Sequence, residues 1–204
     1  MSAPSLLQAT KIALVLLWFI CPAGAAETRP WITLTNCEYV PNTNNDGDSF
    51  YVRAGTNQFI VRLYFVDAPE TNLRYPERTH EQAVHFGATI DETMKAGVRA
   101  KDAVQKLLQR PFVVRTRWAS AAGRSKQPRY YGLVEVGGTN LAEVLVSQGL
   151  ARTKGVVANL PSGEKSKAYV PKLESLEAEA KQKRRGLWAA APEKEPAAAS
   201  PITK

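Results

Sequence analysis

Alternating hydrophobic and polar positions predict five short β-strands along the chain. The predicted strands cover residues 31–39, 49–53, 58–66, 112–118 and 129–136. Turn-forming residues fill 41–48, between the first two strands, and the pair Gly137-Gly138 ends the fifth. Both segments therefore predict turns between short strands.

Helical patterns interrupt these strands. After Pro69, Thr79 and Gln82 have the spacing of a capping box, and so do Thr89 and Glu92. The two pairs predict the starts of two helices. The second helix is expected to bury its larger apolar residues, which are Ile90, Met94, Val98, Val104, Leu107 and Leu108.

Two more helices are predicted in the last third of the chain. One begins at Asn140 as its cap and stops at Gly149. The other runs from about 171 to 185, with Gly186 as a left-handed cap, after which 187–188 (Leu-Trp) is expected to fold back onto the strands. Five strands with about three to four appended helices favour an α+β fold built on a five-stranded OB-fold β-barrel.

The N-terminus has the order of a secretory signal. Lys11 precedes the apolar run 12–20, and small residues follow. Since this run is shorter than the ~20 residues that span a bilayer, we expect export to the periplasm or the extracellular space, with an uncleaved membrane anchor as the alternative. The predicted organisation is a signal peptide at 1–26, one domain at 27–190 and a disordered tail at 191–204.

Charge narrows the class of partner. The chain has 27 Lys and Arg residues against 19 Asp and Glu residues, for a net charge of +8. A basic balance of this size favours polyanionic partners. Charge alone leaves nucleic acids, heparin-like sugars and anionic lipid surfaces open.

Four carboxylates fall at the ends of predicted strands. Asp46 and Asp48 lie in the first turn, and Asp67 and Glu70 follow the third strand. Strand ends can converge in space, and a hard divalent cation prefers carboxylate, carbonyl and water oxygens. The alternative for each pair taken singly is ordinary turn chemistry.

Two arginines favour a metal site over ordinary turn chemistry for these carboxylates. Arg62 interrupts a strand that is otherwise apolar on both faces, and Arg129 opens the fifth strand. A buried arginine needs a charged partner. Guanidinium groups bind phosphate oxygens in a bidentate manner, so acids combined with these arginines indicate phosphodiester chemistry.

These residues carry a resemblance to the staphylococcal nuclease family. The stretches 46–49 (Asp-Gly-Asp-Ser) and 62–71 (Arg-Leu-Tyr-Phe-Val-Asp-Ala-Pro-Glu-Thr) resemble its two signature stretches. Residues 129–134, 141–151 and 186–188 resemble its second half in the same order. The resemblance covers roughly 32–188 and implies an OB-fold barrel that hydrolyses nucleic acids.

The resemblance also implies one bound calcium ion. In family terms the ion is held by the carboxylates of Asp48 and Asp67 and by the carbonyl of Ala68, while Asp46 holds the loop around Asp48. So few protein ligands imply an open and weak site, with a Kd on the order of 10⁻⁴–10⁻³ M, which calcium fills outside cells.

Three residues have catalytic roles by the same resemblance. Glu70 is expected to position the attacking water and to deprotonate it, with orientation of the water alone as the alternative. Arg62 and Arg129 are expected to clamp the phosphate and stabilise its five-coordinate transition state. Arg124 is the alternative to Arg129. Cleavage on the 5′-oxygen side would leave 3′-phosphate ends.

The chain departs from the family pattern at its base-binding residues. The stretch 152–157 contains none of the tyrosines that flank the terminal nucleotide in such enzymes. Tyr130, Tyr131 or Tyr169 is a candidate replacement, and Lys126 is a candidate phosphate contact. An enlarged segment at 72–87 adds a predicted helical piece near the mouth of the site.

The sequence therefore predicts a monomeric, exported, calcium-dependent nuclease acting on single- and double-stranded DNA and on RNA. A catalytically silent OB-fold module that binds nucleic acid or another polyanion is the alternative. A binder of heparin-like sugars or lipid surfaces explains the charge but gives Asp48, Asp67 and Glu70 no purpose.

Overall fold

The computed structural model describes residues 29–121 and 128–190. The predicted signal peptide and C-terminal tail lie outside these ranges, as do Arg124 and Lys126. Within the described ranges, no helix is long and apolar enough to cross a membrane.

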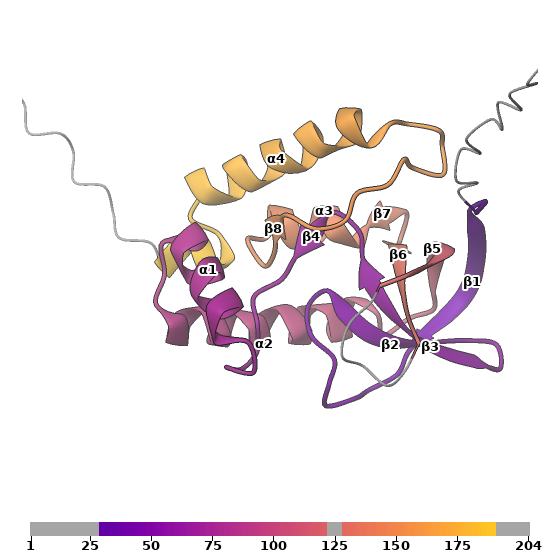
Figure 1. Ribbon diagram of the computed structural model, residues 1–204, viewed down its shortest axis with the longest axis horizontal. Helices are drawn as coiled ribbons and strands as arrows, with labels where there is room; N and C mark the ends of the chain where they lie inside the picture. Colours follow the sequence, from indigo (N-terminus) through magenta and orange to yellow (C-terminus); the bar gives the residue numbers. More distant parts are fainter. Residues whose placement is uncertain (1–28, 122–127, 191–204) are drawn as a thin grey trace, which may run out of the picture.

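Five strands form a closed mixed β-barrel (Figure 1). They are β1 (Ile32–Tyr39), β2 (Ser49–Ala54), β3 (Asn57–Leu63), β5 (Phe112–Ser120) and β6 (Arg129–Val136). Antiparallel pairing follows the order β3-β2-β1-β5-β6, and parallel pairing of β3 with β6 closes the ring. This closure places Arg129 beside Ile60 and Tyr131 beside Arg62.

In the described part of the chain, four α-helices and one 3-10 helix accompany the barrel and confirm the predicted α+β, OB-fold architecture. The helices are α1 (Pro76–Phe86), α2 (Ile90–Leu107), α3 (Leu141–Ser147), α4 (Ser166–Gln182) and η1 (Gly186–Ala190). The remaining strands are short: β4 (Val66–Asp67), β7 (Thr139–Asn140) and β8 (Arg152–Thr153). In Figure 1 the barrel lies on the right, and α2 and α4 lie on opposite sides of the β4–β8 pair.

The predicted third strand, 58–66, is two strands in the structure. β3 ends at Leu63, and Phe65 has a φ of 71°, a left-handed conformation that an extended strand does not adopt. The N–H of Tyr64 still bonds to Gly132 of the barrel at 3.2 Å, whereas the N–H of Phe65 bonds to Val156 at 3.0 Å. The chain therefore leaves the barrel at this kink, and β4 pairs with β8 instead.

Helix α1 begins at Pro76, four residues earlier than a helix capped by Thr79 would begin. Its first helical residue is this proline, and its N-cap makes no side-chain hydrogen bond. Thr79 and Gln82 lie inside the helix and are buried. The predicted capping box there is wrong, because the same spacing arises when polar residues face a buried site. The box at Thr89 and Glu92 is confirmed, with the N–H of Thr89 donating to Glu92 Oε2 at 2.8 Å.

Helix α4 also begins earlier than predicted. It starts at Ser166 and contains Pro171, which removes only one hydrogen bond so near the helix start. Because proline is common at the first position of a helix, the sequence predicts a start at about 171, which is five residues too late. The helix ends at Gln182, so Gly186, with a φ of 56°, begins η1 rather than capping α4.

The predicted burial along α2 is confirmed at Val104 and Leu108, which are 0% and 2% exposed, but small residues form the rest of the buried face. The buried residues of α2 are Thr93, Ala96, Gly97, Ala100 and Val104. Ile90 and Val98 are 39% and 45% exposed. A Cβ at Gly97 would lie 2.4 Å from the carbonyl oxygen of Glu70 and 2.6 Å from that of Pro69, so the helix needs small side chains to approach this segment.

A second, smaller apolar cluster fixes the helices against one another. It consists of Phe86, Ala96, Ala180, Leu187 and Trp188. The ring centroids of Phe86 and Trp188 are 4.5 Å apart. Leu187 and Trp188 thus pack against α1 and α2 and not against the barrel as predicted, because the barrel core is already covered by α3 and α4. The C-terminal end of α1 is anchored in this way.

Candidate functional site

Two chain segments bring their carboxylates to a guanidinium group on a third. Asp48 lies at the end of the first turn, Asp67 lies in β4, and Arg62 lies on β3. Arg62 Nη1 is 2.7 Å from Asp48 Oδ1, and Arg62 Nη2 is 3.4 Å from Asp67 Oδ1. The arginine that interrupts an apolar strand therefore has two buried acidic partners.

The first turn is built so that Asp48 points inward. Asp46 Oδ1 accepts hydrogen bonds from the N–H of Asp48 at 3.0 Å and of Ser49 at 2.6 Å. Asp48 Oδ2 accepts from the N–H of Ala68 at 2.8 Å. A Cβ at Gly47 would lie only 2.7 Å from Ala68 Cβ. The turn residues thus dock the turn onto the segment after β3, and Asp46 holds the loop around Asp48.

Pairing of β4 with β8 places Asp67 opposite Arg152. Asp67 Oδ2 accepts from Arg152 Nε at 2.9 Å and is 2.8 Å from Arg152 Nη2. Arg152 is 3% exposed and also lies 3.3 Å from Glu81, at its Nη1. The kink at Phe65 is what turns β4 toward this partner.

Gln82 is a site residue that sequence reasoning missed. Its side chain is fully buried and donates from Nε2 to Asp67 Oδ2 and to the carbonyl of Ala68, both at 2.9 Å. Its Oε1 accepts from the N–H of Glu70 at 2.9 Å. One amide thus fixes three positions of the segment that carries the acids, at Asp67, Ala68 and Glu70. The one sign of this role in the sequence is that Gln82 is a polar residue among the positions that α1 buries.

Arg78 is the second residue that sequence reasoning missed. It lies one helical turn before Gln82 on α1, and its guanidinium bonds to Asp67 Oδ1 through Nη2. Its Nη1 is 3.0 Å from Glu70 Oε1. Both residues come from the enlarged segment at 72–87, which therefore contributes directly to the site.

Glu70 is held by contacts on both sides. Its N–H bonds to Gln82 and its carboxylate to Arg78, and α2 packs against its backbone at Gly97. Burial raises the pKa of Glu70, although Arg78 opposes the shift. A carboxylate with a raised pKa is better suited to accept a proton near neutral pH.

Substitution of Gly97 tests how closely α2 must approach Glu70. We expect Gly97→Ala to lower the free energy of unfolding by ~1–3 kcal/mol, since the added methyl group meets backbone oxygens that cannot rotate away. Turnover should fall as well because Glu70 moves. The measurement is urea unfolding, with Lys95→Ala on the exposed face of α2 as the control. An unfolding free energy equal to that of the control would show that the helix can shift freely.

The negative and positive charges of the cluster nearly cancel, since four carboxyl groups face three guanidinium groups. Asp46, Asp48, Asp67 and Glu70 face Arg62, Arg78 and Arg152. Burial raises the pKa of Asp48. Burial would also raise the pKa of Asp67, but Arg78, Gln82 and Arg152 together hold it below its usual value. Neighbouring acids with opposite shifts mark this cluster as a functional candidate.

The oxygens of the cluster fit one hard cation. Asp48 Oδ1 is buried and accepts no hydrogen bond within the described residues, because Arg62 Nη1, although 2.7 Å away, is not aligned with it. Asp67 Oδ1, which accepts from Arg78, and the carbonyl of Ala68, which accepts from Gln82, are the other candidate oxygens, and these are ligand types that calcium prefers. No three Asp, Glu, His or Cys side chains of the described residues converge on one ion position. Water would therefore have to complete the coordination.

The structure does not bring Arg129 into this cluster. Its Nε donates to the carbonyl of Ala121 at 2.8 Å, and in the sheet it lies beside Ile60, two positions before the residue beside Arg62. That residue is Tyr131, which stacks on Tyr64 with ring centroids 4.9 Å apart.

The other candidate tyrosines differ in position. Tyr130 packs edge-on against Trp118, with centroids 5.0 Å apart. Tyr169 is 3% exposed and donates to Glu143 at 2.8 Å, so burial makes it unsuitable for stacking on a base. Lys126 falls outside the residues that the structure describes.

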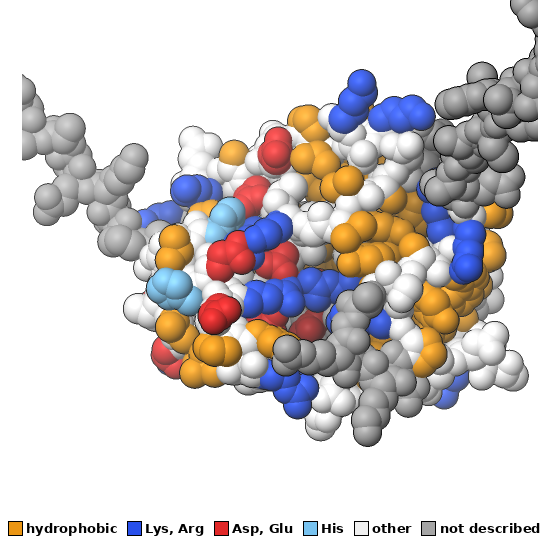
Figure 2. All heavy atoms as spheres, in the orientation of Figure 1, with side chains coloured by type: hydrophobic (Ala, Val, Ile, Leu, Met, Phe, Trp, Pro, Cys, Tyr) orange, Lys and Arg blue, Asp and Glu red, His pale blue; other side chains and the backbone are white. Residues whose placement is uncertain are grey.

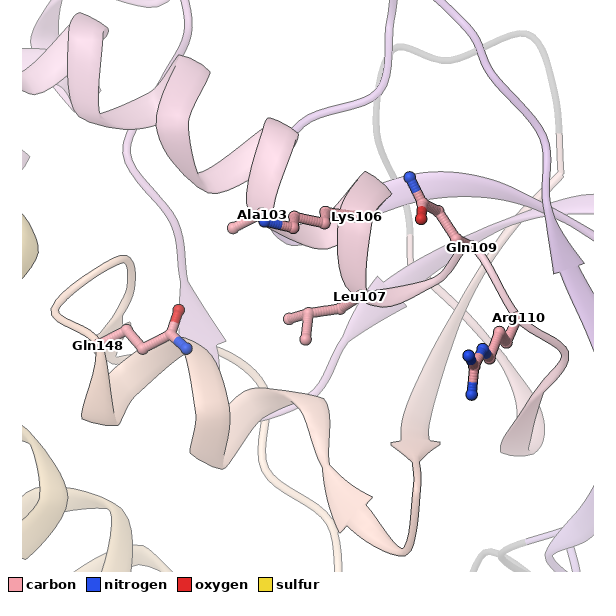
Figure 3. A pocket seen from close by; sticks show the side chains of 6 residues that line it. All are labelled: Ala103, Lys106, Leu107, Gln109, Arg110 and Gln148. Atoms are coloured by element: carbon pink, nitrogen blue, oxygen red, sulfur yellow. The ribbon is translucent and has the colours of Figure 1, made fainter.

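The cluster reaches the surface where basic and acidic side chains lie side by side, over the region of α1 and β8 (Figure 2). An open pocket of about 530 Å³ lies elsewhere, between the C-terminal end of α2 and α3 (Figure 3). Its lining residues are Ala103, Lys106, Leu107, Gln109, Arg110 and Gln148. No carboxylate is among these lining residues, so we place the chemistry at the cluster and not in this pocket.

Comparison with known proteins identifies the family of the chain. No curated protein matches the chain. The family model described as staphylococcal nuclease homologue matches residues 60–190, which include Arg62, Asp67 and Glu70 and exclude Asp48. Since the match covers well over half of the 204 residues, the chain belongs to the staphylococcal nuclease family and contains a nuclease-like or nucleic-acid-binding domain.

Proposed function

We propose that the protein is a calcium-dependent nuclease that hydrolyses phosphodiester bonds in DNA and RNA. The observation that carries this proposal is the contact of one guanidinium, that of Arg62, with both Asp48 and Asp67, with Glu70 three residues beyond. Acidic oxygens for an ion, a donor for phosphate and a carboxylate for water in one cluster support this function.

Calcium would be held by Asp48, Asp67 and the carbonyl of Ala68, and when bound it would neutralise charge on the phosphate. Glu70 orients a water molecule and accepts its proton as the water oxygen bonds to phosphorus. Arg62 donates to the non-bridging oxygens, where negative charge develops. The bond from phosphorus to the 5′-oxygen breaks, that oxygen takes a proton from solvent, and a 3′-phosphate remains.

The test is cleavage of defined oligonucleotides by the full chain. We expect hydrolysis of single-stranded DNA in calcium, loss of hydrolysis on chelation, and products ending in 3′-phosphate. Double-stranded DNA and RNA of the same sequence measure the substrate range. If the folded chain shows no calcium-stimulated cleavage of any of these, the enzyme proposal is wrong.

A silent binding module is the second candidate, and one observation favours it. Asp67 is contacted by Arg62, Arg78 and Arg152, and such a network can serve structure alone. Binding of single-stranded DNA with no hydrolysis, in calcium or without it, would identify the protein as that module.

Calcium should also stabilise the folded chain. With a Kd on the order of 10⁻⁴–10⁻³ M, addition of ~10 mM calcium raises the free energy of unfolding by about 1.4–2.7 kcal/mol. Urea unfolding with and without calcium measures this increment. Asp48→Asn should abolish most of it, while Asp91→Asn, at the exposed start of α2, should leave it intact. An increment that survives Asp48→Asn would move the ion to another site.

We also propose that the protein is exported and that it is a monomer. The apolar run at 12–20, preceded by Lys11, supports a signal peptide. A periplasmic or extracellular location would supply the calcium that a weak site needs. N-terminal sequencing of the exported material tests whether the first 26 residues are removed.

A further inference from the structure

The three guanidinium groups of the cluster differ in their access to solvent. The side chain of Arg152 is 4% exposed, that of Arg62 is 15% exposed and that of Arg78 is 34% exposed. A nucleic acid must approach from solvent, so Arg78 is the guanidinium that it meets first.

Arg78 also lies at the position where the reaction is proposed to occur. It contacts Asp67 Oδ1, a proposed ion ligand, and Glu70 Oε1, the proposed water-binding oxygen. These contacts use two of the five N–H groups of a guanidinium. A phosphate that bridges the ion and the water would therefore lie within reach of the remaining donors.

The barrel itself offers no arginine at the paired position beside Arg62. Tyr131 occupies that position, and Arg129 lies two residues earlier on β6, roughly 6.6 Å along the strand. That spacing suits contact with a neighbouring phosphate of the same strand. The second donor to the reacting phosphate must then come from another element.

Helix α1 holds Arg78 in a fixed place. Its C-terminal end is anchored by the packing of Phe86 on Trp188, and its middle by the three hydrogen bonds of Gln82. A preorganised donor stabilises developing charge better than a mobile one, because it needs no reorganisation during the reaction.

We propose that Arg78 contacts the phosphate in this site alongside Arg62 and is a catalytic residue. The inference rests on the proposed function and assigns it a phosphate-binding residue from the enlarged segment at 72–87. In the structure without substrate, the charge of Arg78 is taken up by Asp67 and Glu70. With substrate and ion bound, phosphate oxygens replace part of these contacts.

Two readouts test this inference on the full chain. The first is turnover on single-stranded DNA in calcium, where Arg78→Ala should lose ~10²–10³-fold. The second is the salt dependence of oligonucleotide binding in the cleavage-deficient Glu70→Gln background. There the slope of log K against log salt should fall by ~0.7 for the loss of one phosphate contact. A role in holding Asp67 alone would not change that slope.

The matched control is Arg110→Ala. Arg110 is exposed, lies after the end of α2 and lines the pocket of Figure 3. Its substitution therefore removes the same charge from another surface. Arg78→Lys keeps the charge and should keep the slope while recovering only part of the turnover, since an ammonium group lacks the planar fork of a guanidinium. Circular dichroism checks that each variant is folded.

The outcomes separate the two proposals. A slope that is unchanged in Arg78→Ala, or reduced equally in Arg110→Ala, overturns the role of Arg78 even if the wild-type chain cleaves DNA. A wild-type chain that binds without cleaving overturns the proposed function, while a slope reduced only in Arg78→Ala still supports the phosphate contact.

Discussion

Arg62→Ala is expected to lower turnover on single-stranded DNA by ~10²–10³, the cost of losing one preorganised donor to a developing oxyanion. The same substitution leaves Asp48 buried without its guanidinium partner, and breaking such a pair costs about 3 kcal/mol of folding stability. Steady-state kinetics and urea unfolding measure the two effects separately.

The control for Arg62 is Arg53→Ala. Arg53 lies on β2, is exposed and pairs with Glu38. Its substitution therefore removes one barrel arginine without changing the cluster. We expect near-wild-type turnover from it. A loss of only a few-fold in Arg62→Ala, together with a large loss of stability, would make Arg62 a structural residue and not a catalytic one.

Gln82→Leu is expected to lower the free energy of unfolding by roughly 3 kcal/mol or more. Leucine has a similar volume but leaves three buried polar groups without the amide: Asp67 Oδ2, the carbonyl of Ala68 and the N–H of Glu70. Each unsatisfied group costs about 1–3 kcal/mol, and the remaining partners of Asp67 offset part of the total.

Gln82→Leu should also reduce turnover, because Glu70 and Ala68 lose the amide that fixes their spacing. Gln105→Leu, on an exposed position of α2, is the matched control and should leave both quantities unchanged. A variant that unfolds at the same urea concentration as the wild-type chain would show that these three contacts are replaced by water.

Much of this fold is encoded locally. The alternation in 112–118 and 129–136 predicts β5 and β6 closely, and the Thr89–Glu92 box predicts the start of α2. The kink in the third strand was not predictable from alternation, because every residue from Leu63 to Val66 is buried. A continuous apolar run has no polar position to mark where the chain changes direction.

Some residues of the site are also identifiable from local sequence, whereas others depend on tertiary packing. Asp48, Arg62, Asp67 and Glu70 lie at strand ends or interrupt an apolar pattern, so their residue types alone identify them as candidates. The partners Arg78 and Gln82 come from a helix whose docking depends on Phe86 and Trp188, more than a hundred residues apart. Spacing along one helix cannot report such a contact, so the sequence predicts only a capping box for Thr79 and Gln82.

If one cluster holds an ion and a phosphate together, each ligand should strengthen the binding of the other. In the Glu70→Gln variant of the full chain, the Kd of a single-stranded oligonucleotide is measured with and without calcium. We expect binding at least about tenfold tighter in calcium, or about 1.4 kcal/mol of coupling, with the same factor for calcium affinity. An oligonucleotide Kd that calcium does not change would contradict this expectation.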